Sequence, residues 1–169
     1  MPSAVDLPFP ELTPIIDDWW RGTHEPGVPP HITLLYPWVD AVGDAEVEKV
    51  RRIAAEAPAF DVSFTAVEAF TAGAVYLRPE PDRPIRDLIA RLAAAFPETP
   101  LYGGAIADPI PHLTLARTEP GVATESARRR IAEALAPHLP VTVSVTALAV
   151  MEPDEGGVWR TLHEIALGG

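Results

Sequence analysis

The sequence predicts an α+β fold: a bilobal, duplicated unit in which two antiparallel sheets, flanked by helices, surround a central cleft with pseudo-two-fold symmetry. Three observations lead to this prediction. Helix-like and strand-like patterns follow the order helix, strand, helix, strand, strand twice along the chain. Two blocks of identical residues recur at one constant spacing. The length of 169 residues, with 47% hydrophobic residues, is enough for one sizeable core.

The repeat is visible in the residues themselves. His31 and His112 define a spacing of 81 residues (112 − 31 = 81). Two blocks obey this spacing: Pro30, His31, Thr33 and Leu34 match Pro111, His112, Thr114 and Leu115, and Val62, Ser63, Thr65 and Ala66 match Val143, Ser144, Thr146 and Ala147. Two blocks at one spacing indicate an internal duplication. We expect a single domain over residues 1–169, with a first repeat at about 11–80 and a second at about 82–169.

The first half is predicted to hold two helices and three strands. Thr13 and Pro14 resemble a helix cap and a first-turn proline, and Asp44 is the cap candidate of the next helix. The strand segments are either rich in β-branched and apolar residues or alternate between apolar and polar ones, with a hairpin turn at 71–73. The expected elements are a helix over 15–21, a strand over 31–38, a helix over 43–57, and strands over 60–70 and 74–79.

The second half repeats that order. Its first helix follows the cap candidate Asp82, carries a single apolar stripe and is closed by Pro97. The expected elements are a helix over 83–96, a strand over 111–117, a helix over 124–139, and strands over 140–151 and 158–167. If the halves pack about a two-fold axis, His31 and His112 become neighbours across the cleft.

The duplicated element that carries chemistry is His-x-Thr. Strand residues two apart point to the same side of a sheet, so His31 shares a face with Thr33, and His112 with Thr114. Of two imidazoles near neutral pH, one can accept a proton from an attacking oxygen while the other donates one to a leaving oxygen. The two hydroxyls can donate hydrogen bonds to phosphate oxygens. This set suits displacement at a phosphodiester without a metal.

Two other interpretations of these histidines, a structural role and a metal site, are weaker. A lone histidine in a strand is more often structural, but two in matching register favour a site. A metal site is disfavoured because threonine is a poor ligand and no carboxylate pair accompanies either motif. The remaining histidines, His24, His138 and His163, have no counterpart in the repeat and are expected at the surface or in structural roles.

Composition limits the partners and the compartment. The absence of cysteine excludes disulfides and cysteine-bound metals. A formal charge of −11 has the wrong sign for gripping long nucleic acid by its phosphates. The chain has no apolar run of about 18 residues that would span a membrane. Its proline-broken start does not resemble a signal peptide, so we expect the cytoplasm.

"HITL" and "HLTL" resemble the paired H-x-[ST]-hydrophobic motifs of the 2H phosphoesterases, and most closely their 2′-5′ RNA ligase and cyclic phosphodiesterase (LigT-like) branch. The resemblance covers nearly the whole chain. It implies metal-independent, reversible chemistry on RNA-type 2′,3′-cyclic phosphates or 2′-5′ linkages, with hydrolysis leaving a 2′-phosphate. It makes His31 and His112 the acid–base pair and Thr33 and Thr114 the phosphate-binding hydroxyls, without deciding which histidine is the base.

Other residues are secondary candidates for the site. Arg117 follows the second motif and is a candidate for binding phosphate, although alternation puts it opposite His112 unless the strand carries a bulge. Tyr36 is a candidate for substrate binding by stacking on a base, against a favoured packing role. Tyr76 and Trp159 are candidate cleft walls, with a core role preferred. We expect Arg128, Arg129 and Arg130 to lie on a solvent-facing helix surface.

One departure from the family concerns the start of the chain. The segment "SAVDLPF" is short and bounded by proline, and it shows no clear apolar strand of the kind that opens these proteins. We therefore expect a trimmed first lobe or a partly open sheet edge.

The sequence predicts a phosphodiesterase of the 2H type without cofactor or metal. Expected partners are a small-molecule nucleotide or short RNA ends, with no membrane and no long nucleic acid, and the expected state is a monomer. Two alternatives stay open: a non-catalytic nucleotide or RNA-end binder with the same fold, and a 2H enzyme that acts on another small cyclic phosphodiester.

Overall fold

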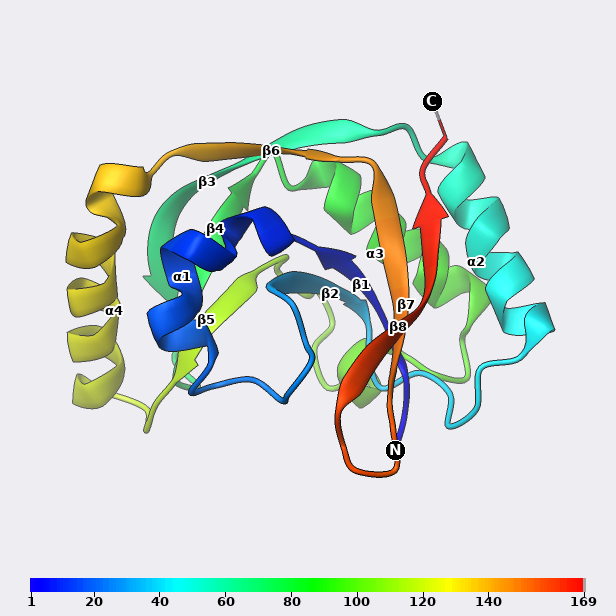
Figure 1. The fold of residues 1–169 in the computed structure, drawn as a ribbon, viewed down its shortest axis with the longest axis horizontal. Helices are drawn as coiled ribbons and strands as arrows, with labels where there is room; N and C mark the ends of the chain where they lie inside the picture. Colours follow the sequence, from blue (N-terminus) through cyan, green and yellow to red (C-terminus); the bar gives the residue numbers. More distant parts are fainter. Residues whose placement is uncertain (169) are drawn as a thin grey trace.

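The structure, a computed structural model, describes residues 1–168 as two four-stranded antiparallel sheets with helices on their outer sides (Figure 1). The helices are α1 (Thr13–Trp20), α2 (Asp44–Glu56), α3 (Arg83–Ala95) and α4 (Val122–Leu135), with short 3₁₀ turns η1 (Pro10–Leu12), η2 (Leu101–Gly104) and η3 (Ala136–His138). The strands are β1 (Ala4–Pro8), β2 (His31–Leu35), β3 (Phe60–Ala69), β4 (Ala74–Glu80), β5 (Leu113–Arg117), β6 (Val141–Val145), β7 (Ala147–Pro153) and β8 (Trp159–Ala166).

Each sheet draws strands from both halves of the sequence. One sheet has the order β2-β1-β7-β8 and the other the order β5-β4-β3-β6. Helices α2 and α3 pack on the first sheet, and α1 and α4 on the second (Figure 1). The helix that precedes each motif strand therefore covers the sheet of the other motif strand. The two sheets form the lobes, and the duplicated halves are interwoven between them.

A pseudo-two-fold axis relates the halves where β3 pairs with β6. Val62 faces Val143 in this antiparallel pair, and the two residues are 81 apart (143 − 62 = 81). Their neighbours form matching hydrogen bonds on either side. Ser63 Oγ lies 2.7 Å from Thr142 Oγ1, and Ser144 Oγ donates to Asp61 Oδ1 over 2.6 Å. The repeated serines thus flank the axis, and each bonds to a residue of the opposite strand.

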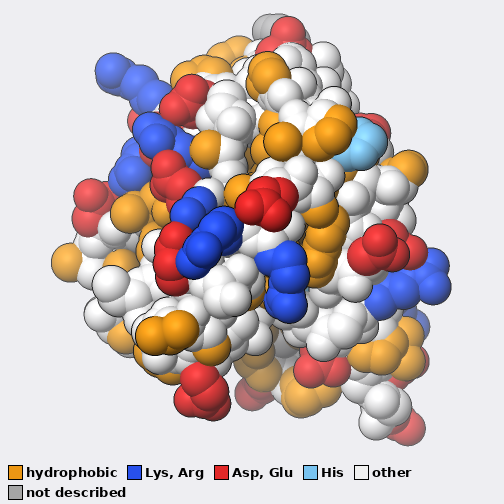
Figure 2. Space-filling view, turned by 90° about the vertical axis from the view of Figure 1, so that its left-hand side faces the viewer, with side chains coloured by type: hydrophobic (Ala, Val, Ile, Leu, Met, Phe, Trp, Pro, Cys, Tyr) orange, Lys and Arg blue, Asp and Glu red, His pale blue; other side chains and the backbone are white. Residues whose placement is uncertain are grey.

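The surface beside α4 does not form a basic patch. Arg128 donates to Glu125 from Nε and Nη2 over 2.8 and 2.6 Å, while Arg129 and Arg130 are exposed, as the sequence predicts. Figure 2 shows this side of the molecule, where Lys and Arg side chains are interleaved with Asp and Glu. Interleaved charges of both signs give little net attraction for a polyanion.

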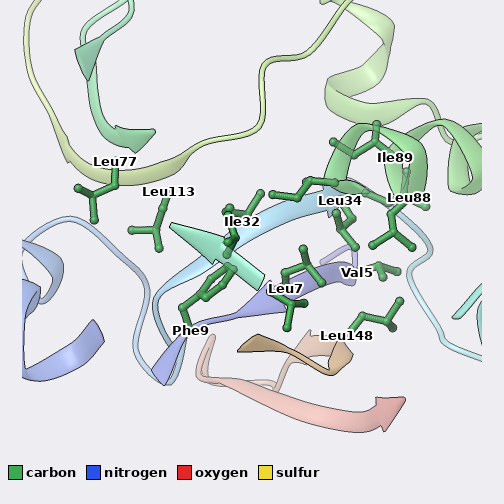
Figure 3. Packing of buried hydrophobic residues seen from close by; sticks show 14 of the residues in the cluster. Val5, Leu7, Phe9, Ile32, Leu34, Leu77, Leu88, Ile89, Leu113 and Leu148 are labelled. Atoms are coloured by element: carbon green, nitrogen blue, oxygen red, sulfur yellow. The ribbon is translucent and has the colours of Figure 1, made fainter. Parts of the chain in front are cut away.

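The core lies between the sheets and their helices and is built by strand alternation. Val5 and Leu7 of β1, and Ile32 and Leu34 of β2, are fully buried on the same side. Figure 3 shows these side chains packed near Leu88, Ile89 and Leu148. Since alternate residues of a strand face opposite ways, the intervening positions Asp6 and Thr33 face away from this core.

The expectation of a trimmed first lobe is wrong. β1 is a central strand between β2 and β7, and the edges of its sheet are β2 and β8. The strand was missed because four of its five residues are buried, so the segment lacks the apolar–polar alternation of a half-exposed strand. Its one charged residue, Asp6, is buried on the side opposite the core.

Several element boundaries also differ from the prediction. α1 begins at Thr13 because η1 runs straight into it, so Thr13 is not a cap. The cap of α2 is Gly43, whose N–H donates to Glu46 Oε2 over 3.2 Å. Asp82 is the cap residue of α3, but it makes no side-chain cap bond there. The expected strand over 140–151 is two strands, β6 and β7, which belong to different sheets.

Within residues 1–168, no helix combines the length and the apolar character needed to cross a membrane.

Candidate active site

One cavity of about 770 Å³ is lined by both sheets, and all six predicted site residues line it. They are His31, Thr33, Tyr36, His112, Thr114 and Arg117. The first three belong to β2 or follow it, and the others belong to β5 or precede it. The fold thus brings the two sequence motifs together at one hollow.

The two histidine rings are held by the same kind of hydrogen bond to a backbone carbonyl. His31 Nδ1 lies 3.0 Å from the carbonyl of Pro29, and His112 Nδ1 lies 2.6 Å from the carbonyl of Ile110. A carbonyl can only accept, so Nδ1 carries the hydrogen in both rings. Nε2 is then the nitrogen available to a ligand in the cavity. In both motifs a proline separates the histidine from the carbonyl that holds it.

The threonines share the cavity face with the histidines, as alternation predicts. Thr114 is buried and Thr33 half-buried. The intervening residues Ile32 and Leu113 are fully buried in the core, together with Leu34 and Leu115. Each motif therefore presents an imidazole and a hydroxyl on a strand whose other face is fixed by packing.

Both motif strands carry a bulge at the same place, and each bulge changes the side of the sheet to which the following side chains point. Between β1 and β2 the register skips Leu34, and between β4 and β5 it skips Leu115. These leucines are equivalent in the repeat (115 − 34 = 81). The extra residue rotates the end of each strand, which brings Tyr36 and Arg117, also 81 apart, to the cavity.

Arg117 lies on the cavity because this bulge supplies the irregularity that the alternation argument required. In residues 1–168 its guanidinium forms no salt bridge. An unpaired guanidinium beside two imidazoles is well suited to bind an anion.

The favoured packing role of Tyr36 is wrong, because its side chain is 38% exposed and lines the cavity. Its ring lies 6.1 Å from that of Trp159, which also lines the cavity, contrary to the preferred core role. Tyr76 is in the core as preferred, with 4% exposure and its ring stacked on Phe70. The two rings are not equivalent because β4 is central in its sheet while β8 is an edge strand.

His24, for which the sequence predicted only a surface or structural role, is part of the cavity wall. Its ring stacks on Trp20 at 3.3 Å between centroids and meets His31 edge-on at 6.0 Å. Nδ1 lies 3.3 Å from the carbonyl of Trp20. Burial, and secondarily the His31 charge, lowers the pKa of His24 to about 4, so this ring is neutral at pH 7. His138 is exposed and lies outside the cavity.

Two further cavity residues were not found from the sequence. Asp6 is 3% exposed and pairs with Thr33 across β1 and β2. Tyr102 on η2 has a left-handed backbone, with φ of 53°, and its N–H donates to the Tyr36 carbonyl over 2.7 Å. A lone carboxylate inside an apolar segment was the available signal for Asp6. The following glycines, Gly103 and Gly104, marked the turn that carries Tyr102.

The electrostatic environment of His112 favours its neutral form. Burial lowers the pKa of His112, and the nearby charges of Arg117 and His31 act in the same direction. The hydrogen bond to the Ile110 carbonyl opposes this shift. A neutral imidazole with a free Nε2 can accept a proton.

The part of the chain described by the structure holds no cluster of three His, Cys, Asp or Glu side chains placed to bind a metal ion.

Comparison with known proteins identifies the class. A sequence profile of the 2′-5′ RNA ligase superfamily matches residues 8–157, so the chain belongs to this superfamily of 2H phosphoesterases. Two relatives carry the name "Putative phosphoesterase". That of Geobacillus kaustophilus is 33% identical over 110 residues, which span 59% of this chain and 57% of that protein's length. That of Geobacillus thermodenitrificans is 25% identical over 152 residues, 87% of this chain and 83% of the relative.

Solved structures share the fold. Escherichia coli LigT in complex with 3′-AMP superposes with a TM-score of 0.62 and 17% identity, over 99% of this chain and 98% of LigT. TT0787 of Thermus thermophilus gives a TM-score of 0.60 at 18% identity, over 100% of this chain and 99% of that protein. The two-sheet α+β architecture is therefore that of the LigT fold.

Proposed function

We propose that this chain is a metal-independent phosphodiesterase that acts on RNA-type 2′,3′-cyclic phosphates or 2′-5′ phosphodiester bonds, with His31 and His112 as general acid and base. The single observation that supports this most is their common arrangement. Both imidazoles line one cavity, and both direct Nδ1 to a backbone carbonyl, which leaves Nε2 to a ligand.

The groups around the histidines fit the needs of phosphoryl chemistry. In hydrolysis one neutral imidazole takes a proton from water, the water oxygen attacks phosphorus, and the P–O3′ bond breaks. The other imidazole, which is protonated at the start, gives its proton to the departing O3′. The products are a 2′-phosphate and a 3′-hydroxyl. Thr33, Thr114 and Arg117 are available to stabilise the charge on the non-bridging oxygens. When a 5′-hydroxyl takes the place of water, its oxygen attacks the same phosphorus, the P–O3′ bond breaks and a 2′-5′ bond forms. Attack of the freed 3′-hydroxyl on that bond is the reverse of this ligation.

A small nucleotide is the favoured substrate size. LigT, which shares this fold, has been crystallised with 3′-AMP, with ATP and with NADP⁺. The cavity of about 770 Å³ is of the size that takes a nucleotide, and Tyr36 and Trp159 offer aromatic rings at its wall. The net charge of −11 disfavours long RNA. We also propose that the protein is a monomer and that it acts in the cytoplasm.

A substrate panel with product analysis tests the proposal. The panel contains 2′,3′-cyclic AMP, 3′,5′-cyclic AMP and a 2′-5′-linked ApA dinucleotide, each with and without excess chelator. We expect turnover of the 2′,3′-cyclic or 2′-5′ substrates, a 2′-phosphate product from the cyclic one, and no loss of rate with chelator.

Other outcomes would overturn it in distinct ways. Thermal protection by the nucleotides without turnover of any phosphodiester would establish the non-catalytic binder instead. Activity that disappears with chelator and returns with a metal ion would contradict the metal-independent chemistry. Turnover confined to a different cyclic phosphodiester would move the substrate class while leaving the two-histidine site in place.

A further inference from the structure

The two His-x-Thr motifs are alike, but the strands next to them are not. Thr33 on β2 faces Asp6 on β1, and Thr114 on β5 faces Tyr76 on β4. β1 and β4 hold the same position in their sheets, each between a motif strand and the third strand. Asp6 and Tyr76 are therefore counterparts in space, although the sequence repeat does not relate them. The strand next to the first motif carries a carboxyl group opposite the threonine, and the strand next to the second motif carries a phenol at that position.

Asp6 is a buried carboxyl group with an unused oxygen. The residue is 3% exposed and lines the cavity, and within residues 1–168 its Oδ1 has no hydrogen-bond partner. Burial raises the pKa of Asp6, while the His31 charge and the Thr33 hydroxyl act in the opposite direction. A buried carboxyl group is costly unless a partner compensates for its lost hydration, and His31 is the cationic partner available to it.

The other half carries the opposite charge. Arg117 lies on the same side of the cavity as His112, and its positively charged guanidinium disfavours protonation of the His112 ring. Three further titratable side chains have rings close to these imidazoles: His24 near His31, and Tyr76 and Tyr102 near His112. They are neutral at pH 7, because the pKa of His24 is lowered to about 4, that of Tyr76 is raised to about 12, and that of Tyr102 is raised. Glu25 and Asp108 lie at the exposed rim.

We propose that Asp6 is a positioning residue that divides the labour between the two motifs, so that His31 enters hydrolysis as the protonated acid and His112 as the neutral base. This inference rests on the proposed phosphodiesterase function. Asp6 acts through His31 by stabilising its positive charge, and it lies beside Thr33, its pairing partner across β1 and β2. Arg117 completes the asymmetry by favouring a neutral His112.

The assignment fixes the path of the protons. His112 Nε2 accepts a proton from water as the water oxygen bonds to phosphorus, and His31 Nε2–H donates its proton to the oxygen whose bond to phosphorus breaks. After turnover His112 holds a proton and His31 has lost one. Exchange with solvent restores the starting state without any further reactant. In ligation a 5′-hydroxyl replaces water and the two roles stay the same, while in cleavage of a 2′-5′ bond by its 3′-hydroxyl the two roles are exchanged.

The first test is the pH dependence of kcat/KM for Asp6→Asn, which keeps the size of the side chain and removes its charge. In the wild type the acidic limb reports protonation of His112 and the alkaline limb reports loss of the proton from His31. We expect Asp6→Asn to move the alkaline limb to lower pH by about one unit and to leave the acidic limb in place. The matched control is Tyr76→Phe, which removes the polar group at the counterpart position and should move neither limb.

A shift of the acidic limb in Asp6→Asn would reverse the assignment, and unchanged limbs would reduce Asp6 to a structural residue. The second test needs no variant of Asp6. The two imidazoles of the wild type are titrated by NMR of isotope-labelled histidine, with resonances assigned from His31→Gln and His112→Gln. His31 is expected to release its proton at a higher pH than His112, and the reverse order or equal values would overturn the inference. This titration is readable even if no phosphodiester is turned over, so failure of the proposed function and failure of this inference are distinguishable.

Discussion

At the scale of single residues, a histidine at the start of an apolar strand is positioned by its own backbone. The Nδ1 bonds of His31 and His112 to carbonyls two residues earlier fix the ring and leave Nε2 free. A rigid strand with a packed reverse face limits the motion of the threonine two residues on. Such preorganised donors stabilise developing charge because they need no rearrangement during the reaction.

The threonine hydroxyls should each contribute to the rate. We expect Thr33→Ala and Thr114→Ala each to lower kcat by about 10²–10³-fold, equivalent to about 2.7–4 kcal/mol, as for loss of one donor to a developing anion. Thr→Ser at the same position keeps the hydroxyl and should restore most of the rate. Steady-state kinetics on the best substrate of the panel provide the measurement. Alanine variants within about threefold of the wild type would rule out this role.

His24 should make the protein sensitive to acid. The pKa of His24 is about 4 in the folded protein, against 6.5 for the free side chain, so the unfolded chain binds more protons between these values. The free energy of unfolding therefore falls as pH falls from about 6.5 to about 4. Allowing for solvent screening of this half-buried ring, we expect a contribution of about 2 kcal/mol.

Urea denaturation of the wild type and of His24→Phe at pH 7 and pH 4.5 measures this effect. Phenylalanine keeps a ring that can stack on Trp20 but cannot take up a proton. The variant should lose less stability than the wild type between the two pH values, and equal losses would show that His24 does not cause the acid sensitivity.

At the scale of elements, the sequence predicted the motif strands and their inward and outward faces but missed β1, and it raised a bulge only as a condition for Arg117 to reach the site. Ile32, Leu34, Leu113 and Leu115 are in the core as alternation predicts. A bulge depends on pairing with a distant strand, so nothing within "HITLLYP" signals that Leu34 is skipped. A strand buried on both faces likewise loses the alternation by which strands are found, as β1 does.

β1 should be essential to the fold because it joins β2 to β7. Leu7 is fully buried in the core, so we expect Leu7→Ala to lower the free energy of unfolding by about 2–5 kcal/mol, including the cavity that it leaves. Val122→Ala on α4 is the control, since Val122 is 89% exposed and should change stability by no more than about 0.5 kcal/mol. Equal effects in urea denaturation would contradict the central position of β1.

At the scale of the whole molecule, the duplication predicted that both histidines meet at one site. What the repeat could not show is that each sheet takes strands from both halves, because strand order is set by long-range pairing. The two-fold relation at Val62 and Val143 brings the motifs together, and the residues that break it, Asp6 against Tyr76 and Tyr36 against Arg117, make the cavity chemically uneven. His24 and Tyr102 were missed for a related reason, since loops reach the cavity only through the fold.

The central claim is that one imidazole from each half acts in the same reaction. The most direct measurement is the rate of 2′,3′-cyclic AMP hydrolysis, in excess chelator, by His31→Gln, His112→Gln and the control His138→Gln, whose histidine is exposed and does not line the cavity. We predict a loss of about 10²–10⁴-fold in each of the first two variants and none in the control. A rate close to that of the wild type in either His31→Gln or His112→Gln would contradict the account.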